Sequence, residues 1–333
     1  MDPVDPVSLA RCLIDIDSTT GREADVGRFL SAYLRERGYS VLEQPLERGR
    51  FNIVAAVGEP HVVFSTHFDC VPPFFASRID GELLHGRGAC DAKGILAAQV
   101  AAAERLRAEG ETRIGLVFVA GEERGSDGAM AVNRIASPAK FLVNGEPTDN
   151  RLGAATRGVY RVRLRAEGRA AHSGYPELGE SAIEKLLDVL YEMRAANWPS
   201  DDLLGTTHYT IGLISGGVAP NVIPPNADAE VVFRSVSDHE ALRTALRRVV
   251  GTRAAIEEVL EVPPVRLRTE DGFETAVFSY TTDIPFLTMW GAPLLLGPGS
   301  IAVAHTDREH IAISELLRGV DLYVSLARRL LAI

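Results

Sequence analysis

The most constraining feature of the sequence is a set of short apolar runs, each followed at once by side chains that can bind a metal ion. The runs are VVFST, IGLVFVA and FLVN, and the residues that follow them are His67 and Asp69, Glu122 and Glu123, and Glu146. Uninterrupted apolar runs of this length are typical of strands buried on both faces of a parallel sheet. Open α/β sheets bind their ligands at the carboxyl ends of such strands. The sequence therefore predicts an α/β domain with a polar site along one edge of its sheet.

Asp91 adds a further carboxylate, in the Gly-rich segment HGRGACDAKG that leads into the helical pattern ILAAQVAAAERLRAE. One imidazole with several carboxylates suits zinc, cobalt or manganese better than a soft-metal or iron–sulfur site. The cysteines, Cys12, Cys70 and Cys90, form no CxxC pair and no even disulfide framework. Cys70 and Cys90 lie close to the expected ligands, but we interpret them as small buried thiols because the donor set is complete without them.

Composition narrows the class of protein. A chain of 333 residues is long for one compact domain, so two domains are expected. Its 35 basic and 45 acidic residues give a net charge of −10, which argues against binding to nucleic acid or an anionic membrane. No apolar run approaches the roughly 20 residues of a membrane span, and the first residues lack the order of a signal peptide. We expect a cytoplasmic protein without a membrane segment.

Periodicity predicts the layers of the first domain. Helical spacing is expected at 7–17, 22–37, 93–109 and 126–136, and strands are expected at 41–46 and 51–57 in addition to the apolar runs. Helices alternating with buried strands predict a three-layer α/β/α domain. From about residue 266 the chain is expected to complete this sheet, with GAPLLLGPGS as a last strand and ISELLRGVDLYVSLARRLLAI as a C-terminal helix.

The pattern changes after about residue 156. TRGVYRVRLRAEG alternates apolar and charged residues, which indicates a half-exposed antiparallel strand. Two helices and three more strands follow, at 178–195, 208–214, 227–236, 237–250 and 254–262. The order β-α-β-β-α-β is that of a ferredoxin-like α+β sandwich. We therefore predict that residues 157–265 form a domain inserted into a catalytic domain made of 1–156 plus 266–333.

The motifs in their order resemble a known family. HFD, GACDAKG, GEERGSDG, NGEPT and AHTDREH, with GRAAHSGYPELGESAIEKL and GGVAPNVIPPNADAEVVFR, resemble the zinc-dependent aminoacylase and carboxypeptidase superfamily. This superfamily includes acetylornithine deacetylase, succinyl-diaminopimelate desuccinylase and glutamate carboxypeptidases, and the GEPT block is most similar to the acetylornithine deacetylase branch. The resemblance implies that 157–265 is a lid or dimerisation domain and that the protein is a homodimer.

The same resemblance implies two divalent metal ions bridged by Asp91. One ion would also be held by His67 and Glu146, and the other by Glu123 and His305. Zinc is the first expectation, with cobalt or manganese as alternatives.

Catalytic roles are likewise carried over from the family. Asp69 matches the carboxylate that orients the ligating imidazole, and Glu122 matches the general base that moves a proton from water to the leaving amine. His172 matches a histidine that reaches across a dimer to stabilise the oxyanion. The residues that match substrate contacts are Asn221, Arg234, Gly299 and, where the insertion begins, Arg157.

Several of these residues also have a purely structural interpretation. A histidine or aspartate at a strand end is often a turn or cap residue, Arg234 could be a solvated strand charge, and Asn221 stands in a Pro-rich turn that favours Asn for backbone reasons. Neither a Walker loop nor an HExxH motif is present. The histidines outside the motifs are interpreted as surface or capping residues: His61, His85, His208, His239 and His310.

We predict from this sequence a metal-dependent amidohydrolase that removes an acyl group, preferably acetyl, from an N-acyl amino acid. The preferred substrate is N-acetyl-L-ornithine, or a close relative such as acetylcitrulline, in arginine biosynthesis. A carboxypeptidase or dipeptidase on the same scaffold is the enzymatic alternative, and a catalytically inactive binding module is the alternative of another class. The presence of every expected ligand and of Glu122 favours an enzyme.

Overall fold

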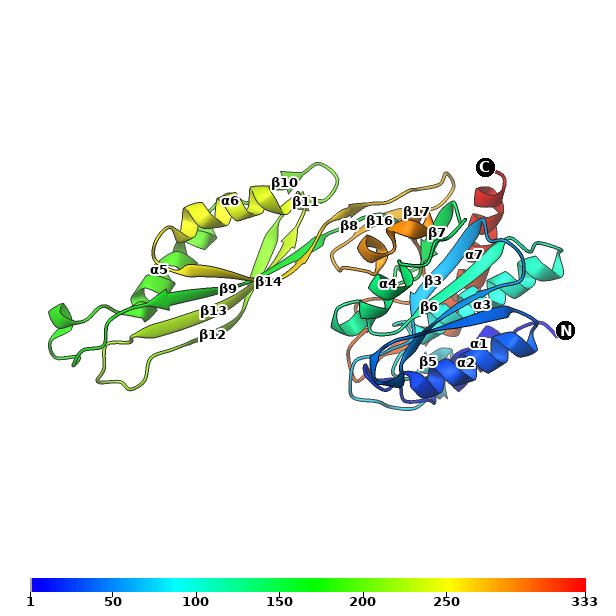
Figure 1. Ribbon diagram of the computed structural model, residues 1–333, viewed down its shortest axis with the longest axis horizontal. Helices are drawn as coiled ribbons and strands as arrows, with labels where there is room; N and C mark the ends of the chain where they lie inside the picture. The colour runs from blue at the N-terminus through cyan, green and yellow to red at the C-terminus, as the bar shows by residue number, and fades with distance from the viewer. Residues whose placement is uncertain (1) are drawn as a thin grey trace. The chain divides into compact units, whose positions relative to one another are not determined.

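The computed structural model describes residues 2–333, which divide into two compact units (Figure 1). The first unit runs to Ala154 and resumes at Leu267–Ala276 and Thr282–Ile333. The second unit comprises Ala155–Arg266 and Val277–Thr281. Each unit has a hydrophobic core of its own.

A six-stranded sheet of order β1-β2-β6-β3-β7-β17 forms the centre of the first unit. Its strands are β1 (Ser40–Pro45), β2 (Phe51–Ala56), β3 (Val62–His67), β6 (Ile114–Val119), β7 (Phe141–Asn144) and β17 (Ala292–Leu295). β3, β6, β7 and β17 are parallel, whereas β2 runs antiparallel to both of its neighbours. Every residue of β3 and β6 is buried, as their continuous apolar sequences predict.

Helices cover both faces of this sheet, and the predicted three-layer α/β/α architecture is confirmed. The helices are α1 (Pro6–Ile14), α2 (Ala24–Glu36), α3 (Lys93–Ala108), α4 (Asp127–Val132) and α7 (Ile313–Leu331). Phe64 and Leu116 share a core with α1, α2, α3 and α7. Val63 and Val117, which point to the opposite face, pack against α4 and the turn that ends at Trp290. Successive residues of one strand therefore serve two different layers.

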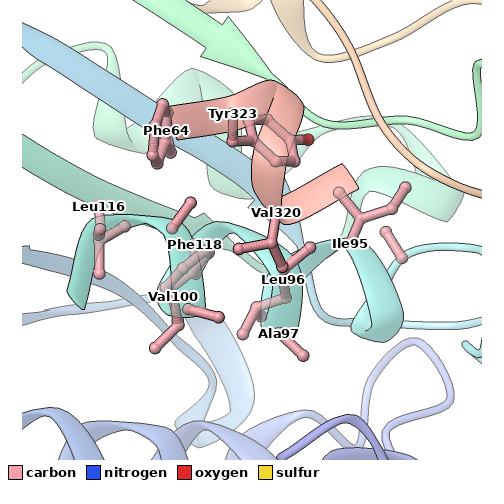
Figure 2. Packing of buried hydrophobic residues seen from close by; sticks show 14 of the residues in the cluster. Phe64, Ile95, Leu96, Ala97, Val100, Leu116, Phe118, Val320 and Tyr323 are labelled. Atoms are coloured by element: carbon pink, nitrogen blue, oxygen red, sulfur yellow. The ribbon is translucent and has the colours of Figure 1, made fainter. Parts of the chain in front are cut away.

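Helix α3 is buried on nearly all of its surface. Figure 2 shows Leu96 and Val100 of this helix among Leu116 and Phe118 of β6 and Val320 of α7. Burying one such side chain contributes about 1.5–3 kcal/mol, and the many alanines of the helix allow close approach to the sheet. Because α3 begins at Lys93, its packing also fixes the end of the loop that precedes it.

The second unit is a four-stranded antiparallel sheet of order β12-β13-β9-β14. Its main elements are β9 (Gly158–Glu167), α5 (Ala182–Ala195), β12 (His208–Gly216), β13 (Asn226–Ser235), α6 (His239–Val250) and β14 (Ala255–Val262). Leu186 of α5 and Leu242 of α6 pack in one core with Val162 and Phe233 of the sheet. The chain order and the strand order together give the ferredoxin-like arrangement that the sequence predicts.

Side-chain caps set the beginnings of three helices. Asp5, Ser181 and Asp238 accept hydrogen bonds from backbone N–H groups in the first turns of α1, α5 and α6. The cap at Ser181 explains why α5 starts later than the predicted residue 178, since Pro176–Leu178 forms a separate 3-10 turn.

Short strands and the ends of two helices differ from the sequence expectation. The sequence does not predict β4 (Arg78–Asp80), β5 (Leu83–His85), β8 (Leu152–Thr156), β10 (Ser200–Asp201), β11 (Gly205–Thr206), β15 (Val265–Arg266), β16 (Thr275–Phe278) and β18 (His310–Ala312). Most of these strands are too short to show a period of two. Helix α1 ends at Ile14 rather than near 17, and α4 ends at Val132 rather than near 136. Within residues 2–333, no helix is long and apolar enough to cross a membrane.

Candidate metal centre

The candidate site lies at the carboxyl ends of three neighbouring parallel strands. β3 ends at His67, a 3-10 turn after β6 begins with Glu122 and Glu123, and Glu146 follows β7 by two residues. Because β6, β3 and β7 are adjacent in the sheet, their ends converge. The loop before α3 supplies Asp91 to the same place.

Asp91 stands between two histidines and presents one carboxylate oxygen to each. His67 Nε2 lies 3.0 Å from Asp91 Oδ1, and His305 Nε2 lies 3.2 Å from Asp91 Oδ2. The two histidines come from positions 238 residues apart in the sequence, and His305 reaches the site from the loop before β18. A carboxylate that faces two nitrogen donors with its two oxygens has the arrangement of a bridging ligand.

Glu123 and Glu146 complete the two sides of this group. Glu123 lies 3.1 Å from His305 Nε2, and Glu146 Oε2 lies 3.9 Å from His67 Nε2. Donor atoms of His67, Asp91 and Glu123 all lie within 4.8 Å of one another. The second oxygen of Glu146, Oε1, is buried and has no hydrogen-bond partner among residues 2–333. A buried carboxylate oxygen without a partner is costly unless a cation occupies the site.

Asp69 is fully buried and joins the end of β3 to the turn after β6. Its carboxylate accepts hydrogen bonds from the backbone N–H groups of Glu122 at 3.1 Å and Glu123 at 3.2 Å, and from the Thr20 hydroxyl at 2.9 Å. The ring of His67 lies close by, with Nδ1 3.5 Å from Asp69 Oδ1 and 3.1 Å from the Asp69 carbonyl oxygen. Asp69 therefore contacts His67, as its predicted orienting role requires, and also holds the turn that carries the two glutamates.

The charges of the group favour a cation at its centre. Burial raises the pKa of Glu122 and Glu146 well above the ordinary value for a glutamate. Although burial alone would raise the pKa of Asp91, hydrogen bonds from His305 and His67 lower it. Hydrogen bonds to Asp91 and Glu123 raise the pKa of His305 to about 10. The negative charge of these carboxylates stabilises the protonated, positively charged form of the histidine. It would stabilise a divalent cation at the same place for the same reason.

The donor set fits divalent ions of the zinc type. Imidazole nitrogens and carboxylate oxygens are the donors that zinc, cobalt and manganese accept, and they converge here from β3, β6, β7 and two loops. Cys70 and Cys90 are buried free thiols, as predicted, and burial raises the pKa of Cys70 to about 12. They stay outside the donor group.

Gly299 lies against the Asp91 loop. A Cβ atom on Gly299 would stand 2.7 Å from the Cβ atom of Cys90, and the backbone at this glycine has a φ of +89°. Only glycine therefore fits this turn without strain.

The predicted residues of the second unit form two pairs. His172 and Asn221 are neighbours, because Val222 bridges to His172 and the Ser173 N–H donates to the Asn221 carbonyl at 3.0 Å. Both side chains are exposed.

The other pair comprises Arg157 and Arg234, which meet around His208. An Arg157 Nη1 atom lies 2.5 Å from His208 Nδ1, and Arg234 is the register partner of His208 across β12 and β13. Burial, followed by the charges of both arginines, lowers the pKa of His208. The two pairs stand at opposite ends of β13, because Asn221 precedes the strand and Arg234 lies near its last residue.

One histidine differs from its predicted surface or capping role. His239 is only 4% exposed, and its ring lies between Ser235 Oγ at 2.9 Å and Glu261 Oε1 at 2.7 Å. It also stacks on Tyr160, with ring centroids 5.5 Å apart. As the first residue of α6, this side chain turns inward onto the sheet and becomes part of the core.

Two carboxylates near the site are missing from the sequence prediction. Asp283 is 1% exposed, its charge acts on both Glu122 and Glu146, and Glu309 is fully buried against the Asp91 loop. Each is a single acidic residue in an irregular segment, so no hydrophobic periodicity in the sequence indicates its burial. The only sequence signal is that Glu309 falls within the AHTDREH motif.

Comparison with known proteins identifies the family. The model of Peptidase family M20/M25/M40 matches residues 63–329, which include every expected ligand. The chain belongs to this peptidase family. An M20 domain-containing protein of Schizosaccharomyces pombe is 37% identical over 330 residues, which cover 95% of this chain and 82% of that protein. A protein of Aspergillus terreus named probable carboxypeptidase is 35% identical over 365 residues, with 95% of this chain and 84% of that protein covered.

Solved structures support the M20 fold. The crystal structure of aminopeptidase PepT from Bacillus cereus superposes with a TM-score of 0.82 over 98% of each chain, at 21% sequence identity. The family match confirms the predicted membership of the aminoacylase and carboxypeptidase superfamily, and the structural similarity confirms the mixed α/β fold class.

Proposed function

We propose that this M20 protein is a metal-dependent amidohydrolase that removes an acyl group, preferably acetyl, from an N-acyl amino acid. N-acetyl-L-ornithine or a close relative in arginine biosynthesis is the preferred substrate. The observation that carries the proposal is the position of Asp91 between His67 and His305, with Glu123 and Glu146 on either side.

Two divalent ions, preferably zinc, with cobalt or manganese as alternatives, would bind around Asp91. His67, Asp91 and Glu146 would hold one ion, and Asp91, Glu123 and His305 would hold the other. When bound, such ions increase the acidity of water and polarise the acyl carbonyl. The buried Glu146 oxygen without a hydrogen-bond partner supports this assignment.

Glu122 is the proposed general base. Its neighbour Glu123 is turned toward His305, while its own backbone N–H is held by Asp69. The Glu122 carboxylate takes a proton from the attacking water and then gives it to the nitrogen of the leaving amine. Burial, which raises the pKa of this carboxyl, suits a group that must hold a proton between these two steps.

The proposed substrate contacts lie in the second unit and at Gly299. His172 would stabilise the oxyanion and Asn221 would contact the substrate beside it. Arg234 and Arg157 would bind a carboxylate of the substrate, because guanidinium groups match carboxylate geometry. Consistent with this role, no described residue forms an ion pair with Arg234 or Arg157, although most other arginines of the second unit have acidic partners.

The separation of the two pairs supports our proposal of a homodimer through residues 157–265. From Asn226 to Arg234, β13 covers about 26 Å at about 3.3 Å per residue, so one small substrate cannot contact both pairs within one copy. A second copy would supply His172 and Asn221 to a site that contains Arg234. The free edge strand β12 exposes Leu213 and Ile214, at 64% and 57%, as a surface that a second copy can cover.

A carboxypeptidase or dipeptidase activity is the second candidate, and the names of related proteins favour it. The relative from Aspergillus terreus is named a probable carboxypeptidase. The same proposed base and metal ligands would serve a peptide bond, and the arginine pair would bind a C-terminal carboxylate.

The test uses protein stripped with a chelator and reloaded with zinc or cobalt. Release of acetate and free amine is measured with N-acetyl-L-ornithine, acetylcitrulline, N-succinyl-diaminopimelate and several dipeptides. A Glu122→Gln preparation serves as the control for contaminating hydrolases. Strongest turnover on an acetylated amino acid would support the deacetylase, and preferred cleavage of dipeptides would support the peptidase. Metal binding without turnover of any substrate would refute both.

A further inference from the structure

A buried ion pair lies directly against the Asp91 loop. Arg87 and Glu309 are 1% and 0% exposed, and Arg87 Nη1 lies 2.5 Å from Glu309 Oε2. The other oxygen, Oε1, accepts hydrogen bonds from the N–H groups of Gly88 at 2.9 Å, Cys90 at 3.3 Å and Asp91 at 3.2 Å. The loop that ends in Asp91 is therefore folded around a carboxylate from a distant part of the chain.

Glycine makes this fold of the loop possible. Gly88 has a φ of +93°, and a Cβ atom there would stand 2.9 Å from Cys70 Sγ. With the backbone turned in this way, the N–H groups of residues 88, 90 and 91 point at one acceptor, as in a backbone anion site, while the Ala89 N–H donates to the Gly86 carbonyl. Here the anion is the Glu309 side chain.

Glu309 also connects this loop to the segment of His305. It follows His305 by four residues, and its carbonyl accepts the Gly86 N–H at 3.2 Å. Immediately after it, β18 pairs antiparallel with β5. His305 has a φ of +63°, an unfavourable backbone conformation for a histidine that its surroundings must maintain. Two segments more than 200 residues apart in the sequence are thus joined next to the 3.2 Å contact between His305 and Asp91.

We propose that Glu309 is a positioning residue that presets Asp91 and His305 for metal binding, an inference that rests on the proposed metal centre. If Glu309 is lost, three N–H donors lose this acceptor and the buried Arg87 keeps only the Pro73 carbonyl as a hydrogen-bond partner, so the loop must rearrange. Asp91 would then no longer hold its two oxygens toward His67 and His305. Because Asp91 is shared by both proposed ion positions, the affinity for both ions would fall.

The experiment measures zinc affinity rather than turnover, by competition with a chromophoric chelator. Glu309→Ala should lower the affinity by about 100-fold, and Glu309→Gln, which keeps one acceptor oxygen, by about 10-fold, the range known for residues that orient metal ligands. The absorption bands of cobalt-loaded protein should shift in the same two variants, since they report the geometry of the ligands.

Glu104→Gln is the matched control. Glu104 lies on α3 with 9% of its side chain exposed, and it pairs with Arg37 at 2.8 Å and Arg107 at 3.1 Å. The substitution removes a largely buried ion-paired carboxylate of the same unit, so it should lower the free energy of unfolding and leave zinc affinity unchanged. If Glu104→Gln and Glu309→Gln lose the same zinc affinity, the loss comes from general destabilisation of the unit. That result would overturn the proposal.

The wild-type titration separates this inference from the proposed function. Wild-type protein that binds no zinc would refute the metal centre itself. Wild-type binding together with unchanged affinity in folded Glu309→Ala, folding being judged by circular dichroism, would overturn the positioning role alone. If the Ala variant does not fold, the Gln variant decides, and unchanged affinity there overturns the proposal.

Discussion

Asp283 offers a quantitative test of the electrostatics around the candidate centre. The side chain is 1% exposed, and its Oδ1 atom has no hydrogen-bond partner within residues 2–333. Burial raises the pKa of Asp283 from 3.8 to about 6, although a hydrogen bond with Ser126 and the charge of His67 act in the opposite direction. The negative charges of Asp69 and Asp127 raise the pKa further.

This pKa shift makes stability depend on pH in a defined direction. Between pH 3.8 and about 6 the folded protein keeps a proton on Asp283 that the unfolded chain releases. The resulting stabilisation is complete below pH 3.8 and is lost as the pH rises through 6. The shift corresponds to about 3 kcal/mol in total, of which about half is lost between roughly pH 5 and pH 8.

The variant Asp283→Asn removes the titration and keeps the shape of the side chain. Urea unfolding of chelator-treated protein at about pH 5, 6.5 and 8 should show the variant gaining about 1.4 kcal/mol relative to wild type across this range. Asp271→Asn, at an exposed position of the same unit, makes the same charge change at the surface and is the control. A difference between wild type and Asp283→Asn that does not change with pH would refute the reasoning.

Three further predictions address the proposed chemistry and assembly. Glu122→Gln should reduce turnover by about 100-fold or more while zinc content stays at the wild-type level, and unchanged turnover would remove Glu122 from the mechanism. His172→Ala and Glu122→Gln should each have strongly reduced turnover alone, but mixed dimers of the two should recover about a quarter of wild-type turnover, because random pairing gives one competent site in half of the dimers. No recovery in confirmed mixed dimers would argue for a site completed within one copy. Leu213→Arg, at an exposed edge-strand position, should give a monomer by size-exclusion chromatography with reduced turnover and unchanged zinc affinity, whereas an intact dimer would place the interface elsewhere.

The sequence predicted the central sheet and its polar edge because both follow from short-range patterns. Continuous apolar runs of this length are typical of strands that are covered on both sides, and the residues after them come together when the strands are parallel neighbours. His67, Glu123 and Glu146 were placed by this argument, and the structure brings their side chains to one location. The alternation in TRGVYRVRLRAEG likewise marked β9, whose arginines pair with Glu230 on the open face of its sheet.

Residues whose surroundings come from distant segments could not be placed in this way. Glu309 looks like an ordinary surface acid in AHTDREH, and its burial depends on Arg87 and on three N–H groups 218 to 221 positions earlier. His239 looks like a cap residue, yet Glu261 of β14 and Tyr160 of β9 enclose its ring. Such positions are determined by tertiary packing, so a single sequence contains no local signal for them.

Asp69 and Glu309 solve the same physical problem at two points of the candidate centre. The glutamates at 122 and 123 and the carboxylate at 91 stand on turns, and turns are ordinarily more mobile than strands. Each turn is folded around a buried carboxylate from another segment, which accepts two N–H groups in the case of Asp69 and three in the case of Glu309. Charge-assisted hydrogen bonds of this kind are stronger than neutral ones, so they hold the turns in a fixed geometry.

Like-charged side chains can then be kept close together before any cation binds, because the backbone cannot move to separate them. If Asp69 or Glu309 is replaced, the loop that it holds should therefore move and the like-charged side chains should separate. The decrease in the free energy of metal binding should then exceed the decrease in the free energy of unfolding.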